Sequence, residues 1–172
     1  MTDLHITHLD NINSTNDYSI ELIKKNISTS GIVISDLQRK GKGRYGNTWI
    51  SRKGNIFCSI YKVINTNNDI INAQFTSLKI VKKYLLETGL NNSYIKIKKP
   101  NDILVKNKKI SGILIESIRY KKKIFLVAGI GINILSSPRI TKYKTTYLNM
   151  YLKKKIKKID FIKFLKKNIN LF

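Results

Sequence analysis

A glycine-rich loop at residues 41–46, with the sequence GKGRYG, is the first segment whose residue types and spacing suggest chemistry. Its glycines allow backbone amides to approach a ligand closely, and Arg44 offers a planar fork of donors for phosphate or carboxylate oxygens. The pattern G-x-G-x-x-G also occurs in dinucleotide-binding loops, but there it opens a helix. Here it leads into an apolar, β-branched run, so we interpret it as an anion-binding loop between strands, with a basic surface turn as the alternative.

Three more features downstream could contribute to the same site. Asn101 and Asp102 stand at the start of a predicted strand, where they could face a nucleotide or its magnesium ion, although Asn-Asp is also common in turns. Lys109 begins the next predicted strand, and its residue type alone does not distinguish it from the many other lysines. Residues 128–133, AGIGIN, place two glycines in an apolar strand, which favours close approach of a ligand or another backbone.

The elements that must position these residues follow from the hydrophobic periodicity. Apolar residues at helical spacing predict three helices. The first covers residues 15–26, and the second is capped by Asp69 and stops at Gly89. The third begins at Asp160 and has one apolar face, formed by Phe161, Phe164, Leu165 and Ile169. β-Branched runs predict strands at 31–35 and 55–63 and a meander at 102–105, 109–118 and 123–135. This order predicts an α+β domain, with a mixed or antiparallel β-sheet covered by helices.

Composition limits the class of protein. The 172 residues are enough for one domain with its own core. No apolar run reaches the roughly 18 residues that a membrane helix needs, and the N-terminal residues lack the features of a secretory signal, so we expect a cytoplasmic protein without membrane contact. The one cysteine, Cys58, lies in an apolar run and is expected to be a buried thiol. The sequence shows no cluster of His, Cys or carboxylates that would indicate a transition metal.

The formal net charge of +23 allows three interpretations. Nearly all of the excess is lysine, spread over the whole chain beside abundant Ile and Asn, which favours compositional drift in an A+T-rich coding sequence. A nucleic-acid-binding module is the second interpretation, but the densest tract, residues 153–158, lacks aromatic side chains for base stacking. Attraction to an acidic protein or a nucleotide is the third.

Taken together, five motifs in this order resemble the biotin protein ligase family, and specifically the catalytic domain of biotin-[acetyl-CoA-carboxylase] ligases. The motifs are Ser14-Thr15-Asn16, the segment from Gln38 to Trp49 (QRKGKGRYGNTW), Lys98-Lys99-Pro100-Asn101-Asp102, the segment from Lys109 to Glu116 (KISGILIE) and the segment from Gly129 to Asn133 (GIGIN). The resemblance covers nearly the whole chain and implies a fold like that of class II aminoacyl-tRNA synthetases. It also implies that residues 1–172 form this catalytic domain alone, with the family's N-terminal winged helix and C-terminal SH3-like domain absent.

The resemblance implies an enzyme that joins biotin and ATP into biotinyl-5′-AMP, with release of diphosphate. Such an enzyme then passes the biotinyl group to a lysine of the biotin carboxyl carrier protein of acetyl-CoA carboxylase. ATP and Mg²⁺ are the implied cofactors, biotin is the implied substrate, and a homodimer is a possible assembly. The family's site residues correspond here to Lys109 and Arg44 for catalysis; to Ser14, Thr15, Asn16, Gln38, Gly41, Lys42 and Gly112 for biotin; to Trp49, Asn101, Asp102 and Asn133 for ATP; and to Asp102 for Mg²⁺.

Two departures from the family pattern and two rival functions accompany this resemblance. Lys42 stands where the family's loop has an arginine, which keeps the charge but loses the bidentate fork, and Lys99 stands where tryptophan is usual. The nearest rival is a lipoate or octanoate ligase or transferase on a related scaffold, which is not expected to show the Gly-Arg-rich loop or Gln38. A basic nucleic-acid-binding module is the rival from another class.

Overall fold

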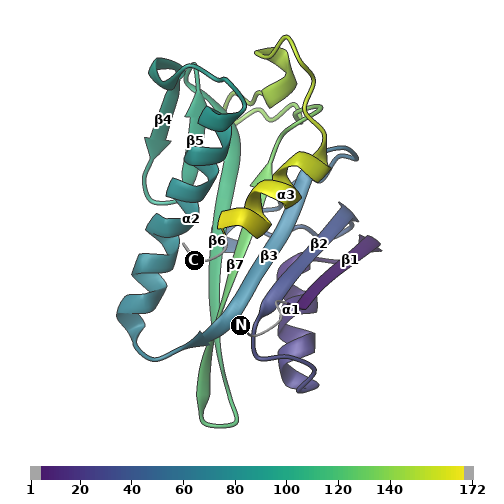
Figure 1. Ribbon diagram of the computed structural model, residues 1–172, viewed down its shortest axis with the longest axis vertical. Coiled ribbons are helices and arrows are strands. Elements are labelled where there is room, and N and C mark those ends of the chain that lie inside the picture. The colour runs from purple at the N-terminus through teal and green to yellow at the C-terminus, as the bar shows by residue number, and fades with distance from the viewer. Residues whose placement is uncertain (1–4, 169–172) are drawn as a thin grey trace.

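The computed structural model describes residues 5–168, apart from the side chain of Asn67, and shows a seven-stranded sheet in the order β1-β2-β3-β7-β6-β5-β4 (Figure 1). The strands are β1 (His5–Ile12), β2 (Gly31–Gln38), β3 (Ile56–Ile64), β4 (Ile95–Lys98), β5 (Asp102–Val105), β6 (Lys108–Tyr120) and β7 (Lys123–Ile132). Strands β1 and β2 pair in parallel, and the other neighbours pair antiparallel. The predicted mixed sheet and meander are therefore confirmed.

Within the described residues, three α-helices cover the two faces of the sheet. In Figure 1, α2 (Asn67–Glu87) and α3 (Lys158–Asn168) lie in front of the sheet, and α1 (Thr15–Lys24) lies behind it. Successive strand residues point to opposite faces, so on β2 Ile32 and Ile34 join the core beneath α2 and α3, whereas Val33 packs with the side chains of α1. Among the described residues, no helix combines the length and apolar character that crossing a bilayer requires.

The helix ends follow the expected capping rules with one correction. Ser14 caps α1, because its Oγ accepts a hydrogen bond from the backbone N–H of Asp17 at 3.4 Å. Asp69 was predicted as the cap of α2 but is the third residue of that helix, where its carboxylate accepts from the backbone N–H groups of Asn65 and Thr66. These hydrogen bonds, led by the one from Thr66, lower the pKa of Asp69. Gly89 ends the helix with a φ of +91°, as predicted.

The two edge strands, β1 and β4, were not predicted from the sequence. Strand β1 is polar, with exposed His5 and His8, and it is a strand only because its backbone pairs with β2. Strand β4 is four residues long and pairs with β5 alone. Edge strands have weak sequence signals because one side of each meets no other strand. Ile169, predicted to lie on the apolar face of the last helix, falls outside the described residues.

The predicted burial of Cys58 is confirmed and leads to a testable expectation. The side chain is 1% exposed on β3, and burial raises the pKa of its thiol to about 12, so the thiol stays protonated at neutral pH. We expect no reaction with Ellman's reagent in the native protein and one equivalent after unfolding in guanidinium chloride, both measured by absorbance. Rapid modification of the folded protein would contradict this burial.

Candidate active site

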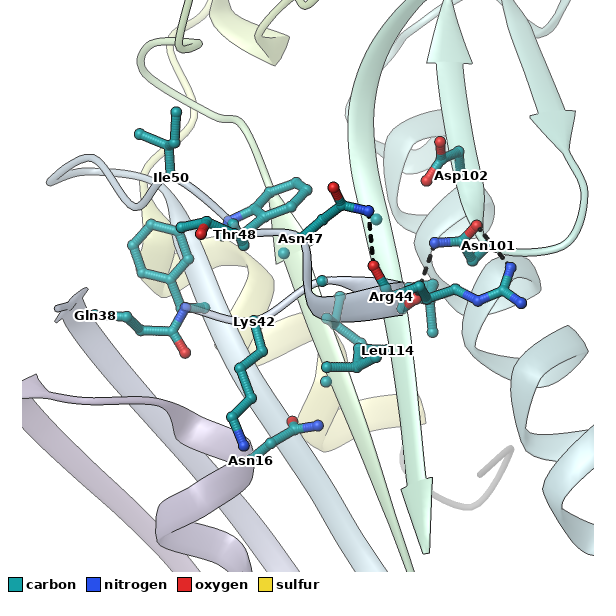
Figure 2. A pocket seen from close by; sticks show the side chains of 18 of the residues that line it. Asn16, Gln38, Lys42, Arg44, Asn47, Thr48, Ile50, Asn101, Asp102 and Leu114 are labelled. Atoms are coloured by element: carbon teal, nitrogen blue, oxygen red, sulfur yellow. Dashed lines mark hydrogen bonds between the residues drawn. The ribbon is translucent and has the colours of Figure 1, made fainter. Parts of the chain in front are cut away.

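A pocket of about 470 Å³ lies on the same face of the sheet as α1, beneath the glycine-rich loop (Figure 2). Its floor is formed where β3, β7 and β6 run side by side. Phe57 on β3 pairs with Gly131 on β7, which in turn pairs with Gly112 on β6. Two residues earlier on β7, Gly129 pairs with Ser59 of β3 on one side and with Leu114 of β6 on the other. Three glycines in adjacent positions leave the sheet without side chains there, and this hollow forms the pocket.

Two side chains lie against this glycine floor. A Cβ on Gly131 would lie 2.5 Å from Cε2 of the Trp49 indole, so the ring packs directly on the β7 backbone. A Cβ on Gly129 would lie 2.4 Å from Oδ1 of Asn16. Any larger residue at either position would therefore displace the side chain above it. The two glycines hold Trp49 and Asn16 at two neighbouring places on the same floor.

A β-bulge explains how Lys109 reaches the pocket. Residues three apart in a regular strand face opposite sides of the sheet, yet Lys109 and Gly112 both line the pocket. Opposite β5, Ile103 pairs with Ser111 and Leu104 pairs with Lys109, so Ile110 is an extra residue. The extra residue shifts the alternation by one and turns Lys109 towards Gly112. A Cβ on Gly112 would lie 3.4 Å from Nζ of Lys109.

The amine of Lys109 is held among one carboxylate and two aromatic rings. Its Nζ lies 2.8 Å from Oδ1 of Asp102, and the two side chains are only 15% and 19% exposed. The ring centroids of Trp49 and Tyr143 lie 5.6 Å and 5.1 Å from the same Nζ, within the range of cation–π attraction. The Lys109 backbone is also fixed, because its N–H donates to the carbonyl of Lys144 at 2.9 Å. The lysine is therefore positioned in advance of any ligand.

Amide and hydroxyl groups form the polar end of the pocket. Oε1 of Gln38 accepts from the backbone N–H of Thr15 at 2.8 Å and from its hydroxyl at 3.1 Å, and Nε2 of Gln38 donates to Ser51. Oγ of Ser59 lies 2.7 Å from the Thr15 hydroxyl and 2.5 Å from Oδ1 of Asn16. Ser59, Thr15 and Asn16 are all almost fully buried. Such a network offers several donors and acceptors in fixed directions.

The glycine-rich loop doubles back like a small hairpin and does not open a helix of the kind that binds a dinucleotide. The N–H of Trp49 donates to the carbonyl of Gly41 at 2.9 Å, and the N–H of Gly43 donates to that of Asn47 at 2.7 Å. Arg44 follows Gly43 in a single 3₁₀ turn, and its Nη1 lies 3.4 Å from Oδ1 of Asn101 (Figure 2). The predicted loop between strands is thus confirmed.

The pocket brings together most of the predicted site residues. Those that line it are Lys109, Arg44, Ser14, Thr15, Asn16, Gln38, Lys42, Gly112, Trp49, Asn101 and Asp102. Gly41 does not line the pocket: it is buried, and a Cβ there would lie 2.4 Å from the Trp49 carbonyl oxygen. Asn133 does not line the pocket: it is 2% exposed, its Nδ2 donates to the carbonyl of Thr146, and its Oδ1 has no partner within residues 5–168. The ligand roles of these residues stay predictions.

Several residues of the site were not singled out from the sequence. Ser59 is a small polar residue in an apolar strand that does not line the pocket itself, and only the structure shows that it contacts Thr15 and Asn16, which do. Lys142 and Tyr143 come from the segment after β7 and line the pocket from there. A weak signal existed for Ser59, because a polar residue inside an apolar run is unusual. For Lys142 and Tyr143 the sequence offered no periodicity to interpret.

The fold and the pocket define a ligand-binding α+β domain whose site combines a hydrogen-bonding end with cationic side chains, an arrangement suited to a small anionic molecule. The model of the biotin/lipoate A/B protein ligase family matches residues 9–133. The chain therefore belongs to the biotin/lipoate A/B protein ligase family. This confirms the resemblance that the five motifs indicated.

Individual relatives agree with this membership. Biotin–protein ligase 2 of Arabidopsis thaliana is 33% identical over 131 residues, which are 74% of this chain and 38% of that protein. The biotin–[acetyl-CoA-carboxylase] ligase of Paracoccus denitrificans is 30% identical over 73% of this chain and 52% of its own length. The structure of biotin protein ligase from Aquifex aeolicus in complex with biotin and ATP has a TM-score of 0.73 at 26% identity, covering 96% of this chain and 70% of that one. The chain thus spans about half or less of the length of these two sequence relatives.

Proposed function

We propose that this protein activates biotin with ATP to form biotinyl-5′-AMP and then transfers the biotinyl group to a lysine of a biotin carboxyl carrier protein. The observation that carries the proposal is the pocket itself, in which the Gln38–Thr15 polar end and the two cations Lys109 and Arg44 face one cavity. The relatives named for biotin ligation, and the Aquifex aeolicus structure with biotin and ATP, support it.

The first step needs fixed positive charge. A carboxylate oxygen of biotin attacks the α-phosphorus of ATP, the new bond forms there, and the bond to the bridging oxygen breaks as pyrophosphate leaves. Both reactants are anions, so Lys109 and Arg44 would offset their repulsion and stabilise the charge of the transition state. Asp102, with the phosphates, would hold Mg²⁺, which commonly needs only one or two carboxylates in such sites. Within residues 5–168, no group of three His, Cys, Asp or Glu residues offers an alternative metal site.

In the second step, the amine of the carrier lysine attacks the carbonyl carbon of the mixed anhydride. An amide bond forms, AMP leaves with the electrons of the broken C–O bond, and the amine loses a proton. Water would compete for the same carbonyl carbon. The glycine-rich loop lies over the pocket, where it can exclude that water until the carrier arrives.

The polar end of the pocket favours biotin over lipoate or octanoate. A ureido ring carries two N–H donors and one carbonyl acceptor, whereas a dithiolane ring or an alkyl chain carries none of these groups. Gln38 and Thr15 line this end of the pocket, and Ser59 contacts the Thr15 hydroxyl. In the ligand-free protein these groups bond to one another, so a ureido ring would replace some of those hydrogen bonds with its own, whereas a dithiolane ring or an alkyl chain could replace none.

ATP–pyrophosphate exchange tests the proposal. We expect exchange that requires biotin and Mg²⁺, and transfer of one biotinyl group to a purified carrier domain, seen as a mass increase. Lipoate and octanoate, supplied separately at the same concentration, are expected to support no exchange. Exchange with lipoate or octanoate in place of biotin, or with none of the three acids, would refute the proposal.

A further inference from the structure

The loop cation Lys42 has partners of its own and does not share those of Arg44. Figure 2 shows Lys42 and Arg44 leaving the loop in different directions, Lys42 towards Asn16 and Arg44 towards Asn101. Nζ of Lys42 donates to Oδ1 of Asp17, in the first turn of α1. The hydrogen bond to Asp17 raises the pKa of Lys42, so its amine stays charged at neutral pH. Lys42 therefore ties the loop to α1.

A second carboxylate, that of Glu116 on β6, extends this contact into the pocket. Its Oε1 lies 4.0 Å from Nζ of Lys42, and its Oε2 accepts a hydrogen bond from Nδ2 of Asn16 at 2.6 Å. The amide group of Asn16 is thereby oriented with its Oδ1 towards Ser59, at 2.5 Å. One chain of polar contacts thus runs from the loop cation to the buried end of the pocket.

We propose that Lys42, Asp17 and Glu116 form a latch that holds the glycine-rich loop closed over the pocket. The tip of the loop is joined to the body of the protein by Lys42 on one side and by the weaker Arg44–Asn101 contact, at 3.4 Å, on the other. All three latch residues are positioning residues, since they act through the loop and through Asn16. The latch assigns Lys42 a different task from the ligand contact that the motif predicted.

The latch also has an electrostatic function. Asp17 and Glu116 lie next to a pocket that, by the proposed function, binds a carboxylate and a phosphate, and two unpaired carboxylates would repel such a ligand. Lys42, with one positive charge, offsets part of these two negative charges. The closed loop itself does not depend on the proposed function, whereas its effect on catalysis does.

Hydrogen–deuterium exchange of the loop, read by mass spectrometry on the ligand-free protein, tests the latch. Lys42→Met and Asp17→Asn are each expected to raise the exchange rates of the Gly43 and Trp49 amides by about two- to fivefold, the range typical of exposed ion pairs. Lys42→Arg, which keeps the positive charge between Asp17 and Glu116, should leave the rates close to those of the wild type. Lys25→Met serves as the matched control, because it removes a 2.6 Å pair with Glu21 on the same helix but outside the loop.

Unchanged hydrogen exchange in both Lys42→Met and Asp17→Asn, or exchange in Lys42→Arg as fast as in Lys42→Met, would overturn the latch. Under the proposed function, Lys42→Met should also release more pyrophosphate per biotinyl group transferred, because an opened loop admits water to the intermediate. The two proposals can fail separately. If the variants speed hydrogen exchange in the loop but the protein shows no biotin-dependent ATP–pyrophosphate exchange, the latch is supported and the proposed function is refuted. If the protein is an active ligase but hydrogen exchange in the loop does not change, only the latch is refuted.

Discussion

Replacing Lys109 with methionine is expected to lower the rate of biotin-dependent ATP–pyrophosphate exchange by about 10²- to 10³-fold, the range found when one preorganised charge-stabilising group is removed. Methionine keeps most of the length of the side chain but removes the positive charge. The variant also leaves Asp102, which is only 19% exposed, without its ion-pair partner, so an anionic ligand would meet repulsion in place of attraction. Lys108→Met, one residue earlier on β6 and outside the pocket lining, is the matched control.

Comparing the double variant Lys109→Met/Asp102→Asn with Asp102→Asn alone separates two explanations of that loss, because both variants lack the carboxylate proposed to hold Mg²⁺. If Lys109 acts only by neutralising Asp102, the two variants should have the same rate of ATP–pyrophosphate exchange. If Lys109 stabilises the reacting carboxylate and phosphate directly, the double variant should be slower than Asp102→Asn by a large factor. Equal rates in these two variants, or a loss in Lys108→Met comparable to that in Lys109→Met, would contradict the assigned catalytic role.

Alanine at Gly131 or Gly129 is expected to impair the binding of two different ligands. A Cβ at Gly131 would lie 2.5 Å from the indole of Trp49, so Gly131→Ala displaces the ring that is predicted to pack on adenine. A Cβ at Gly129 would lie 2.4 Å from Oδ1 of Asn16, so Gly129→Ala disturbs the polar end predicted to hold biotin. Overpacking of this kind costs about 1–3 kcal/mol, which corresponds to a loss of affinity of about 5- to 150-fold if the cost falls on the bound state.

Calorimetric titrations with biotin and with ATP measure how much each variant weakens the binding of each ligand. Gly131→Ala should weaken ATP binding more than biotin binding, and Gly129→Ala should do the reverse. Trp49 is the only tryptophan, so its fluorescence should also change in Gly131→Ala before any ligand is added. Gly89→Ala is the control for a general loss of stability. A Cβ there meets nothing within 4 Å, but alanine is strained at the positive φ of +91°, and Gly89 does not line the pocket. Equal loss of both ligands in both variants would contradict the two-ended site.

The sequence by itself determined the class of fold, most elements and nearly the whole set of chemical groups. Hydrophobic periodicity is local, so it predicted α1, α2, α3 and the central strands from neighbouring residues alone. The ordered motifs then predicted which residues would share a site, and the pocket brings together all of them except Gly41 and Asn133. Burial of Cys58 followed from the same kind of local pattern.

Tertiary structure decided what depends on pairing between distant segments. Strands β1 and β4 exist through backbone pairing at the sheet edges, where side-chain alternation gives little signal. The sequence showed that Lys109 and Gly112 are three residues apart. The bulge at Ile110, which directs both residues towards the same pocket, depends on how β6 pairs with β5. For the two cations of the glycine-rich loop, the motif predicted ligand roles only: catalysis for Arg44 and biotin binding for Lys42. Only the approach of Asp17 and Glu116, one from α1 and one from β6, distinguishes the proposed latch residue Lys42 from Arg44, because charge–charge contacts across the fold have no local pattern in the sequence.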